Sequence, residues 1–175
     1  ATALSRGRGE GPITGPDYRM KPHKEIMIIT GPSGSGKFSA LKVFEDLGFY
    51  VCDNLPAELF PGLVDLLNSK YKKRSVAIVM DARNPDFLLK LEDCQQKAEQ
   101  SGFNLRILFL ETHDSVLLRR FSETRRRHPL SPSGSILQGI EREKNLLQPL
   151  KQNAHHILDT SFLNIHELRE ALLKT

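Results

Sequence analysis

The sequence predicts an α/β fold, a three-layer α/β/α sandwich built on a mostly parallel five-stranded sheet. Three observations support this prediction. Short apolar stretches of strand length alternate with segments that carry apolar residues at helical spacing. The strands are apolar almost throughout, which is typical of parallel strands covered by helices on both faces. A glycine-rich loop joins the first expected strand to the first expected helix.

Five apolar stretches of the chain are expected to form the strands. An acidic residue directly follows four of them and marks the point where each strand ends. Right-handed crossovers between parallel strands bring these ends to one edge of the sheet, where such folds bind ligands. In chain order the expected strands are residues 26–30, 48–52, 76–80, 105–110 and 156–158.

Apolar residues recur at helical spacing between the strands, as at Leu59, Leu63 and Leu66. Gly48 is expected to end the first helix, and residues 129–134, with two prolines and a glycine, to separate the fourth helix from the fifth. In chain order the expected helices are residues 39–47, 57–68, 87–100, 115–127, 135–147 and 165–173.

The loop after the first strand matches the Walker A phosphate-binding pattern at every position but one. Its glycines let successive backbone N–H groups point at one centre, and the N-terminus of the next helix attracts an anion. Lys37 is expected to reach the outer phosphates and to be catalytic. A plain glycine-rich connector is the alternative, which the flanking strand and helix disfavour. The expected phosphate-binding residues are Gly31, Pro32, Ser33, Gly34, Ser35, Gly36, Lys37 and Phe38.

Phe38 stands where this pattern normally has Ser or Thr, whose hydroxyl binds Mg²⁺. Ser39 lies about 100° further round the helix, so it reaches the same point only if the helix begins elsewhere. Phosphate binding through backbone N–H groups and Lys37 does not need this hydroxyl. We therefore expect binding to be weaker and less metal-dependent than usual, and hydrolysis to lose its usual metal ligand.

Asp81 follows the third expected strand in the manner of a Walker B carboxylate. We expect it to be catalytic and to hold Mg²⁺ directly or through water; the alternative is a strand-end aspartate that caps the next helix. Arg83 beside it can bind a phosphate through two parallel hydrogen bonds or form a surface ion pair. Asp53 and Asn54 suit an acceptor substrate and a turn about equally.

The densest cationic feature of the sequence lies within the fourth expected helix and just after it. Arg119 and Arg126 are seven residues apart, as are Arg120 and Arg127, so on one helix the two pairs would stack along a shared side. This arrangement suits a nucleoside triphosphate or an RNA backbone; the alternative is a solvated face balanced by Glu123 and by Glu141 or Glu143. Residues 129–134 then suggest a loop that closes like a lid. The candidate phosphate and lid residues are Arg119, Arg120, Arg125, Arg126 and Arg127.

Length and composition favour one domain over residues 25–175, because the 175-residue chain is 39% hydrophobic and can bury one sizeable core. No apolar stretch approaches the roughly 18 residues of a membrane span. Cys52 and Cys94 have no partner at metal-ligand spacing, so neither a disulfide framework nor a zinc site is expected. A cytoplasmic protein without membrane association fits these features best.

The net charge of +4 is uneven along the chain. Residues 1–24 hold five of the 25 Lys and Arg but two of the 21 acids, so they supply +3 and leave about +1 for the rest. Global basicity is therefore no argument for nucleic-acid binding. We expect residues 1–24 to be a disordered or expression-derived tail, with Met20 as the candidate natural start.

Several segments, in this order, resemble the RapZ/YvcJ family of bacterial nucleotide-binding proteins, over about residues 25–175. Besides the Walker A loop, the matching segments are Ala40-Leu41, residues 45–50, Asp53-Asn54-Leu55-Pro56, Asp81-x-Arg83-Asn84, residues 109–111, residues 119–126 with His128-Pro129-Leu130, and Asp159-Thr160-Ser161.

The resemblance implies a P-loop domain of the NTPase and kinase-like fold that binds ATP and GTP. It implies that residues 31–38 bind ATP and that Asp81, Ala82, Arg83 and Asn84 are associated with GTP. It further implies weak nucleotide hydrolysis and, in some members, an adaptor that presents a small regulatory RNA to a ribonuclease. The family's second, C-terminal domain is credited with RNA and effector binding, and we expect it to lie outside this chain. The family normally has Ser at the position of Phe38.

Two other functions remain open from the residues themselves. Asp53 and the arginine-rich segment also suit a small-molecule kinase that transfers the γ-phosphate of ATP to a bound acceptor. An RNA-binding module that uses the same arginines is the third hypothesis.

Overall fold

The computed structural model describes residues 24–71, 74–81, 85–131 and 133–175 of the chain. Its sheet has the strand order β2-β3-β1-β4-β5, and each neighbouring pair is parallel. The predicted α/β class and five-stranded sheet are confirmed. The strands are β1 (Glu25–Thr30), β2 (Tyr50–Asp53), β3 (Val76–Val79), β4 (Asn104–Glu111) and β5 (His156–Asp159).

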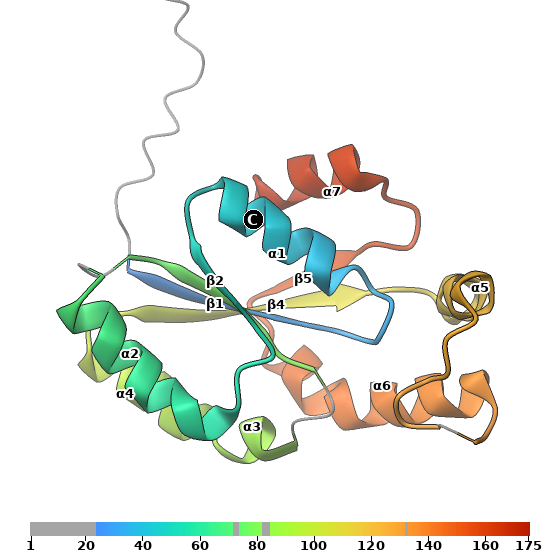
Figure 1. Ribbon diagram of the computed structural model, residues 1–175, viewed down its shortest axis with the longest axis horizontal. Coiled ribbons are helices and arrows are strands. Elements are labelled where there is room, and N and C mark those ends of the chain that lie inside the picture. The colour runs from blue at the N-terminus through green and yellow to red at the C-terminus, as the bar shows by residue number, and fades with distance from the viewer. Residues whose placement is uncertain (1–23, 72–73, 82–84, 132) are drawn as a thin grey trace, which may run out of the picture.

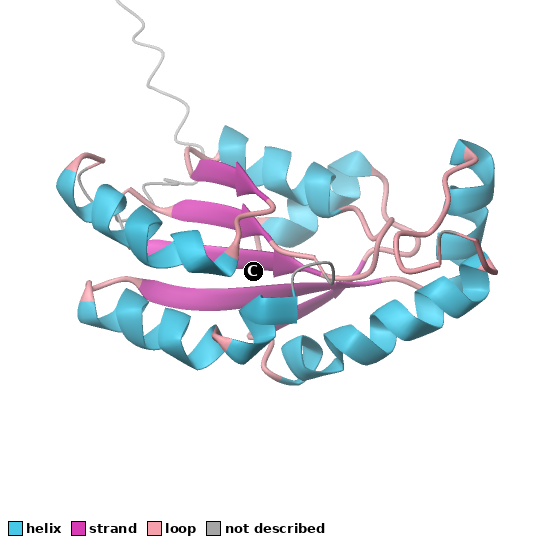
Figure 2. Cartoon of the chain, turned by 60° about the horizontal axis from the view of Figure 1, so that its bottom comes forward, coloured by secondary structure: helices cyan, strands magenta, loops and turns pink. Residues whose placement is uncertain are grey.

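Helices cover both faces of the sheet and make it the middle of three layers (Figures 1 and 2). Helices α1 and α7 pack on one face, and α2, α3, α4 and α6 on the other. Helix α5 lies beyond the carboxyl edge, where it packs on the first half of α6. The helices are α1 (Lys37–Asp46), the 3₁₀ helix η1 (Ala57–Leu59), α2 (Phe60–Ser69), α3 (Pro85–Leu89), α4 (Leu91–Gln100), α5 (Asp114–Thr124), α6 (Ile136–Gln152) and α7 (Ile165–Leu172).

The protein has one hydrophobic core on each face of the sheet, and the alternation of side chains along β1 explains both. Ile26 and Ile28 are fully buried against α2, α4 and the end of α6, whereas Met27 and Ile29 are buried against α1 and α7. Because successive strand residues point to opposite faces, a strand covered on both sides must be apolar throughout. The uninterrupted apolar stretches of the sequence have this physical cause.

Three predicted helix boundaries were wrong. The helix predicted over residues 87–100 is interrupted at Lys90, which separates α3 from α4. The helix predicted to stop at residue 127 ends at Thr124, because Arg125 adopts a left-handed conformation with φ 51°. Helix α6 continues to Gln152 with Pro149 inside it, and burial of Leu150 in the core favours this continuation over an earlier end.

No helix among the described residues is long and apolar enough to cross a membrane. Both cysteines are free thiols.

The environment of the cysteines leads to a labelling prediction. Cys94 of α4 is buried, and desolvation raises the pKa of its thiol from 9.0 to about 11, whereas half-buried Cys52 has a smaller upward shift of its pKa from the same cause. Since the thiolate is the reactive form, about a hundredfold less of it is present at Cys94 than at an ordinary thiol near pH 8. We expect a disulfide-exchange reagent at pH 8 to label Cys94 far more slowly in the folded protein than in denaturant.

A Cys52→Ala variant makes Cys94 the one thiol in this assay, and mass spectrometry verifies the labelled position. Labelling of Cys94 in the folded protein at the rate of the denatured chain would contradict its burial.

Candidate functional site

The glycine-rich loop runs from the end of β1 to the first turn of α1, as the sequence predicts. Gly31, Gly34 and Gly36 have positive φ angles of 143°, 87° and 96°, values that residues other than glycine rarely adopt. The Ser35 N–H donates to the Pro32 carbonyl over 3.0 Å inside the loop. The glycines therefore allow the turns by which the chain curls around the N-terminus of α1.

Lys37 is the first residue of α1, and its side chain turns back over the loop. The ammonium Nζ donates to the Gly31 carbonyl over 2.7 Å and to the Pro32 carbonyl over 3.0 Å. The positive charge is thereby held at the mouth of the loop, a position from which it would attract an anion.

A cavity of about 540 Å³, which we call the first cavity, opens beside the loop at the carboxyl edge of the sheet. Asp53 enters it from the end of β2 and Asp81 from the residues after β3, and both lie there with Ser33 and Lys37 of the loop. Asp81 is 9% exposed. The structure thus brings two of the four acidic strand ends together with the lysine that the sequence selects.

Phe38 is the second residue of α1, and its ring is 62% exposed at the first cavity. The Lys42 ammonium lies 5.3 Å from the centre of this ring. Because α1 begins at Lys37, the start of the helix is not shifted, and Ser39 does not take the place of Phe38. Among the described residues no group of three or more His, Cys, Asp or Glu side chains is placed to hold a metal ion.

The predicted stacking of arginines in pairs on one helix is wrong, because α5 ends before Arg125. Arg119 is exposed and lies 3.9 Å from Glu123, so it fits the solvated face that was the alternative. Arg125 is also exposed and lines neither cavity at the loop. Arg126 and Arg127, from the segment after the helix, do line the first cavity.

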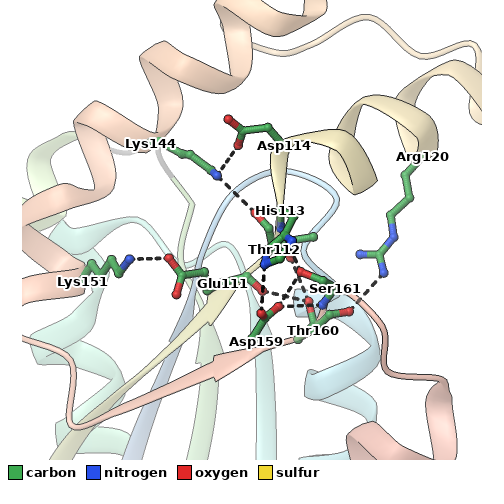
Figure 3. Close-up of polar contacts among 10 residues, drawn as sticks. All are labelled: Glu111, Thr112, His113, Asp114, Arg120, Lys144, Lys151, Asp159, Thr160 and Ser161. Carbon is green, nitrogen blue, oxygen red and sulfur yellow. Dashed lines mark hydrogen bonds and ion pairs between the residues drawn. The ribbon is translucent and has the colours of Figure 1, made fainter.

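Arg120 joins three parts of the site. Its Nη1 donates to the Gly34 carbonyl of the loop over 2.7 Å. Its Nη2 donates to the Thr160 carbonyl after β5 over 3.3 Å (Figure 3). Its guanidinium lines the first cavity and also a second cavity of about 330 Å³ between the loop and residues 160–168. Arg120 therefore lies between the two cavities.

The turn after β5 is hydrogen-bonded to the loop and to the residues that follow β4 (Figure 3). The Thr160 hydroxyl donates to the Ser35 carbonyl over 2.7 Å and lies 2.8 Å from the Thr112 hydroxyl. The hydroxyl and the N–H of Ser161 donate to the Asp159 carboxylate and lower its pKa. Thr160 lines the second cavity, whereas Asp159 does not.

Two residues that are not among the candidate site residues of the sequence analysis lie buried beside the loop. Glu143, considered above as a solvated counter-charge, is 1% exposed, and so is His128. Both belong to a network that ends on Ser33 of the loop. One signal could have found Glu143, since it lies on the same face of α6 as Ile140 and Leu147, three residues after one and four before the other.

Part of the predicted site lies outside the described residues. Ala82, Arg83 and Asn84, which follow Asp81, are among these positions, and so is Pro132 of the predicted lid segment. The predicted tail over residues 1–24 is described only at Lys24.

The sequence is similar to that of known proteins over nearly all of the described chain. A family model for the RapZ-like N-terminal domain matches residues 24–175. Relatives named nucleotide-binding protein, from Geobacter metallireducens and Geotalea uraniireducens, are 46% and 49% identical to it over 149 residues. Each alignment covers 85% of this chain and 52% of the relative, so the chain spans about half the length of these relatives.

Solved structures of low sequence identity share the fold. A shikimate kinase from Bacteroides thetaiotaomicron matches with a TM-score of 0.56 at 18% identity, over 85% of this chain and 94% of the kinase. The YorR protein from Bacillus subtilis, in complex with phosphorylated GDP, matches with a TM-score of 0.55 at 16% identity, over 85% and 94%. The fold is therefore that of the P-loop kinases.

Proposed function

We propose that this chain, which belongs to the RapZ-like N-terminal domain family, is a regulatory domain that binds ATP or GTP at its Walker A loop and hydrolyses it slowly. The observation that carries the proposal is the loop itself: three glycines at positive φ at the N-terminus of α1, with the Lys37 ammonium at its mouth. Backbone N–H groups and a lysine in this arrangement bind phosphate. The names of the relatives support this ligand class.

The two cavities suit the two ends of such a ligand. The first cavity holds Lys37, Asp81, Arg126 and Arg127, and we assign it to the terminal phosphates. The second cavity is lined by loop residues together with Leu163, Ile165 and Leu168, and its apolar side chains suit the nucleoside. Arg120, which lines both, would face the phosphates between them.

We propose that Mg²⁺ assists nucleotide binding. The residues present supply one of its two usual protein ligands. Asp81 can hold the ion directly or through water at the first cavity, while Phe38 contributes no oxygen. When bound, the ion would neutralise phosphate charge. Lys37 and Asp81 are the proposed catalytic residues, and the missing hydroxyl is the reason why we propose slow turnover.

Isothermal titration with ATP and with GTP, on the wild type and on Lys37→Ala, tests this function. We expect the wild type to bind, and the variant to bind at least about tenfold more weakly, because a charge-assisted contact contributes roughly 1.5 to 3 kcal/mol. Lys70→Ala is the matched control, since Lys70 is exposed at the end of α2, at the opposite edge of the sheet. Absence of binding by the wild type, or equal affinity in Lys37→Ala, would refute the proposal.

A small-molecule kinase is the second candidate, and the residues that line the first cavity favour it. The cavity extends beyond Lys37 to Asp53, so there is room past the terminal phosphate for an acceptor near a carboxylate. Incubation with γ-labelled ATP and a panel of small alcohols and sugar phosphates separates the two candidates. Labelled acceptor indicates a kinase, and free phosphate alone indicates hydrolysis.

A further inference from the structure

Glu143 holds Ser33 of the loop with both of its carboxylate oxygens. The Ser33 N–H donates to Oε2 over 2.8 Å, and the Ser33 hydroxyl donates to Oε1 over 2.7 Å. A carboxylate that is 1% exposed must receive such donors, because an unpaired buried charge is very costly. Ser33 is thereby fixed from outside the loop by a helix 110 residues further along the chain.

His128 supplies the third donor to this carboxylate. Its Nδ1 accepts the Leu130 N–H over 3.2 Å, so the ring proton of the neutral imidazole lies on Nε2, which is 3.0 Å from Glu143 Oε2. The backbone around the ring is turned by the hydrogen bond from the Ser131 N–H to the His128 carbonyl. The Glu143 carboxylate therefore connects a turn after α5 with the phosphate-binding loop.

The position of the His128 ring is built into the fold. The Phe121 ring lies 5.0 Å from it, and on α6 a Cβ at Gly139 would lie 2.5 Å from its Cγ. Helix α6 thus needs a glycine at residue 139 for the ring to pack, and four residues later it places Glu143 against the same ring. Such close packing leaves the ring little freedom to move unless its partners move as well.

Ser33 lies at the end of the loop where we assign the terminal phosphate. It lines the first cavity, whereas the second cavity is lined by Gly34, Ser35 and Gly36 and does not include it. A terminal phosphate that reaches Ser33 meets donors already taken by a carboxylate, and two anions repel each other at short range. In this assignment a nucleoside diphosphate, which lacks the terminal phosphate, would not reach Ser33.

We propose that His128 and Glu143 are positioning residues that couple the turn at residues 128–131 to the terminal-phosphate end of the loop. This proposal rests on the nucleotide-binding function proposed above. A triphosphate competes with Glu143 for Ser33 and shifts the His128 ring, and a diphosphate leaves the network in place. Because such coupling is reciprocal, weakening the network strengthens triphosphate binding relative to diphosphate binding.

Nuclear magnetic resonance of the chain with ¹⁵N-labelled histidine rings provides the first test. We expect the His128 ring to be neutral, with its proton on Nε2. Its nitrogen signals should shift on saturation with ATP and should not shift on saturation with ADP. His155 is the internal control, because it precedes β5, is hydrogen-bonded to the Ile107 backbone and lines neither cavity. If ATP binds by titration and His128 does not respond, or responds equally to ADP, the coupling is refuted while nucleotide binding stands.

Affinity ratios provide the second test. Glu143→Gln keeps the shape and an acceptor for the Ser33 N–H but removes the charge, and we expect the ratio of ATP to ADP affinity to rise about three- to tenfold. His128→Gln keeps a donor near the former Nε2 and should stay close to the wild-type ratio, whereas His128→Ala should follow Glu143→Gln. An unchanged ratio in Glu143→Gln overturns the proposal. If the wild type binds no nucleotide, both the proposed function and the coupling are refuted.

Discussion

Alanine at Gly31 is expected to lower the free energy of unfolding by about 2 to 4 kcal/mol and to abolish nucleotide binding. A Cβ at this position would lie 2.3 Å from the Leu110 carbonyl oxygen and 2.9 Å from Ser35 Oγ, at a φ of 143° that alanine avoids. The first contact is with the backbone of β4, a strand paired on both sides, so it cannot give way cheaply. Relief therefore requires the loop itself to move.

Thermal unfolding and nucleotide titration together measure this prediction. A loss of that size lowers the melting temperature by roughly 5 to 15 °C for a domain of this length. The control is Gly62→Ala, since Gly62 lies in α2 and an added Cβ there meets no atom within 4 Å. We expect the control to be neutral or stabilised by up to about 1 kcal/mol. An unchanged melting temperature in Gly31→Ala would contradict the tight approach of the loop to β4.

Serine at Phe38 is expected to make nucleotide binding depend on Mg²⁺. The hydroxyl would stand at the second residue of α1, where Walker A loops place their metal ligand. We expect ATP affinity in Mg²⁺ to rise roughly tenfold, equivalent to about 1.4 kcal/mol, and turnover to rise with it. The fold should tolerate the change within about 0.5 kcal/mol, because the Phe38 ring is exposed.

Phe38→Ala separates the metal from the bulk of the ring. Alanine removes the aromatic side chain without adding an oxygen, so its binding should respond to Mg²⁺ as weakly as that of the wild type. If alanine and serine raised affinity equally, the ring would be an obstruction and not the place of a missing ligand. If neither variant responded to Mg²⁺, the metal would be held elsewhere or would not bind.

The sequence was sufficient to predict the layers of the fold and the location of the loop. These features depend on local signals, namely apolar stretches that are buried on both faces and a fixed spacing of glycines before a lysine. Ile26 and Met27 are buried on opposite faces of the sheet. Burial of both faces can be predicted from the uninterrupted apolar stretch alone, without knowing which helices cover them.

The errors concern features that depend on distant contacts. No glycine, asparagine or proline marks the end of α5 at Arg125, so the arginines were predicted to continue on one helix. Pro149 signals an end to α6 that burial of Leu150 overrides. Helical spacing puts Glu143 on the buried face of α6, but no local pattern connects it to its partners Ser33 and His128.

The long separation between the parts that hold the loop has a consequence for synthesis. Ser33 is fixed by Glu143, 110 residues later, and Ser35 by Thr160, 125 residues later. When the loop and α1 emerge from the ribosome, Glu143 and Thr160, which hydrogen-bond to the loop, have not yet been synthesised. The nascent chain gains the finished loop only after β5 has emerged, so nucleotide cannot guide the early steps of its folding.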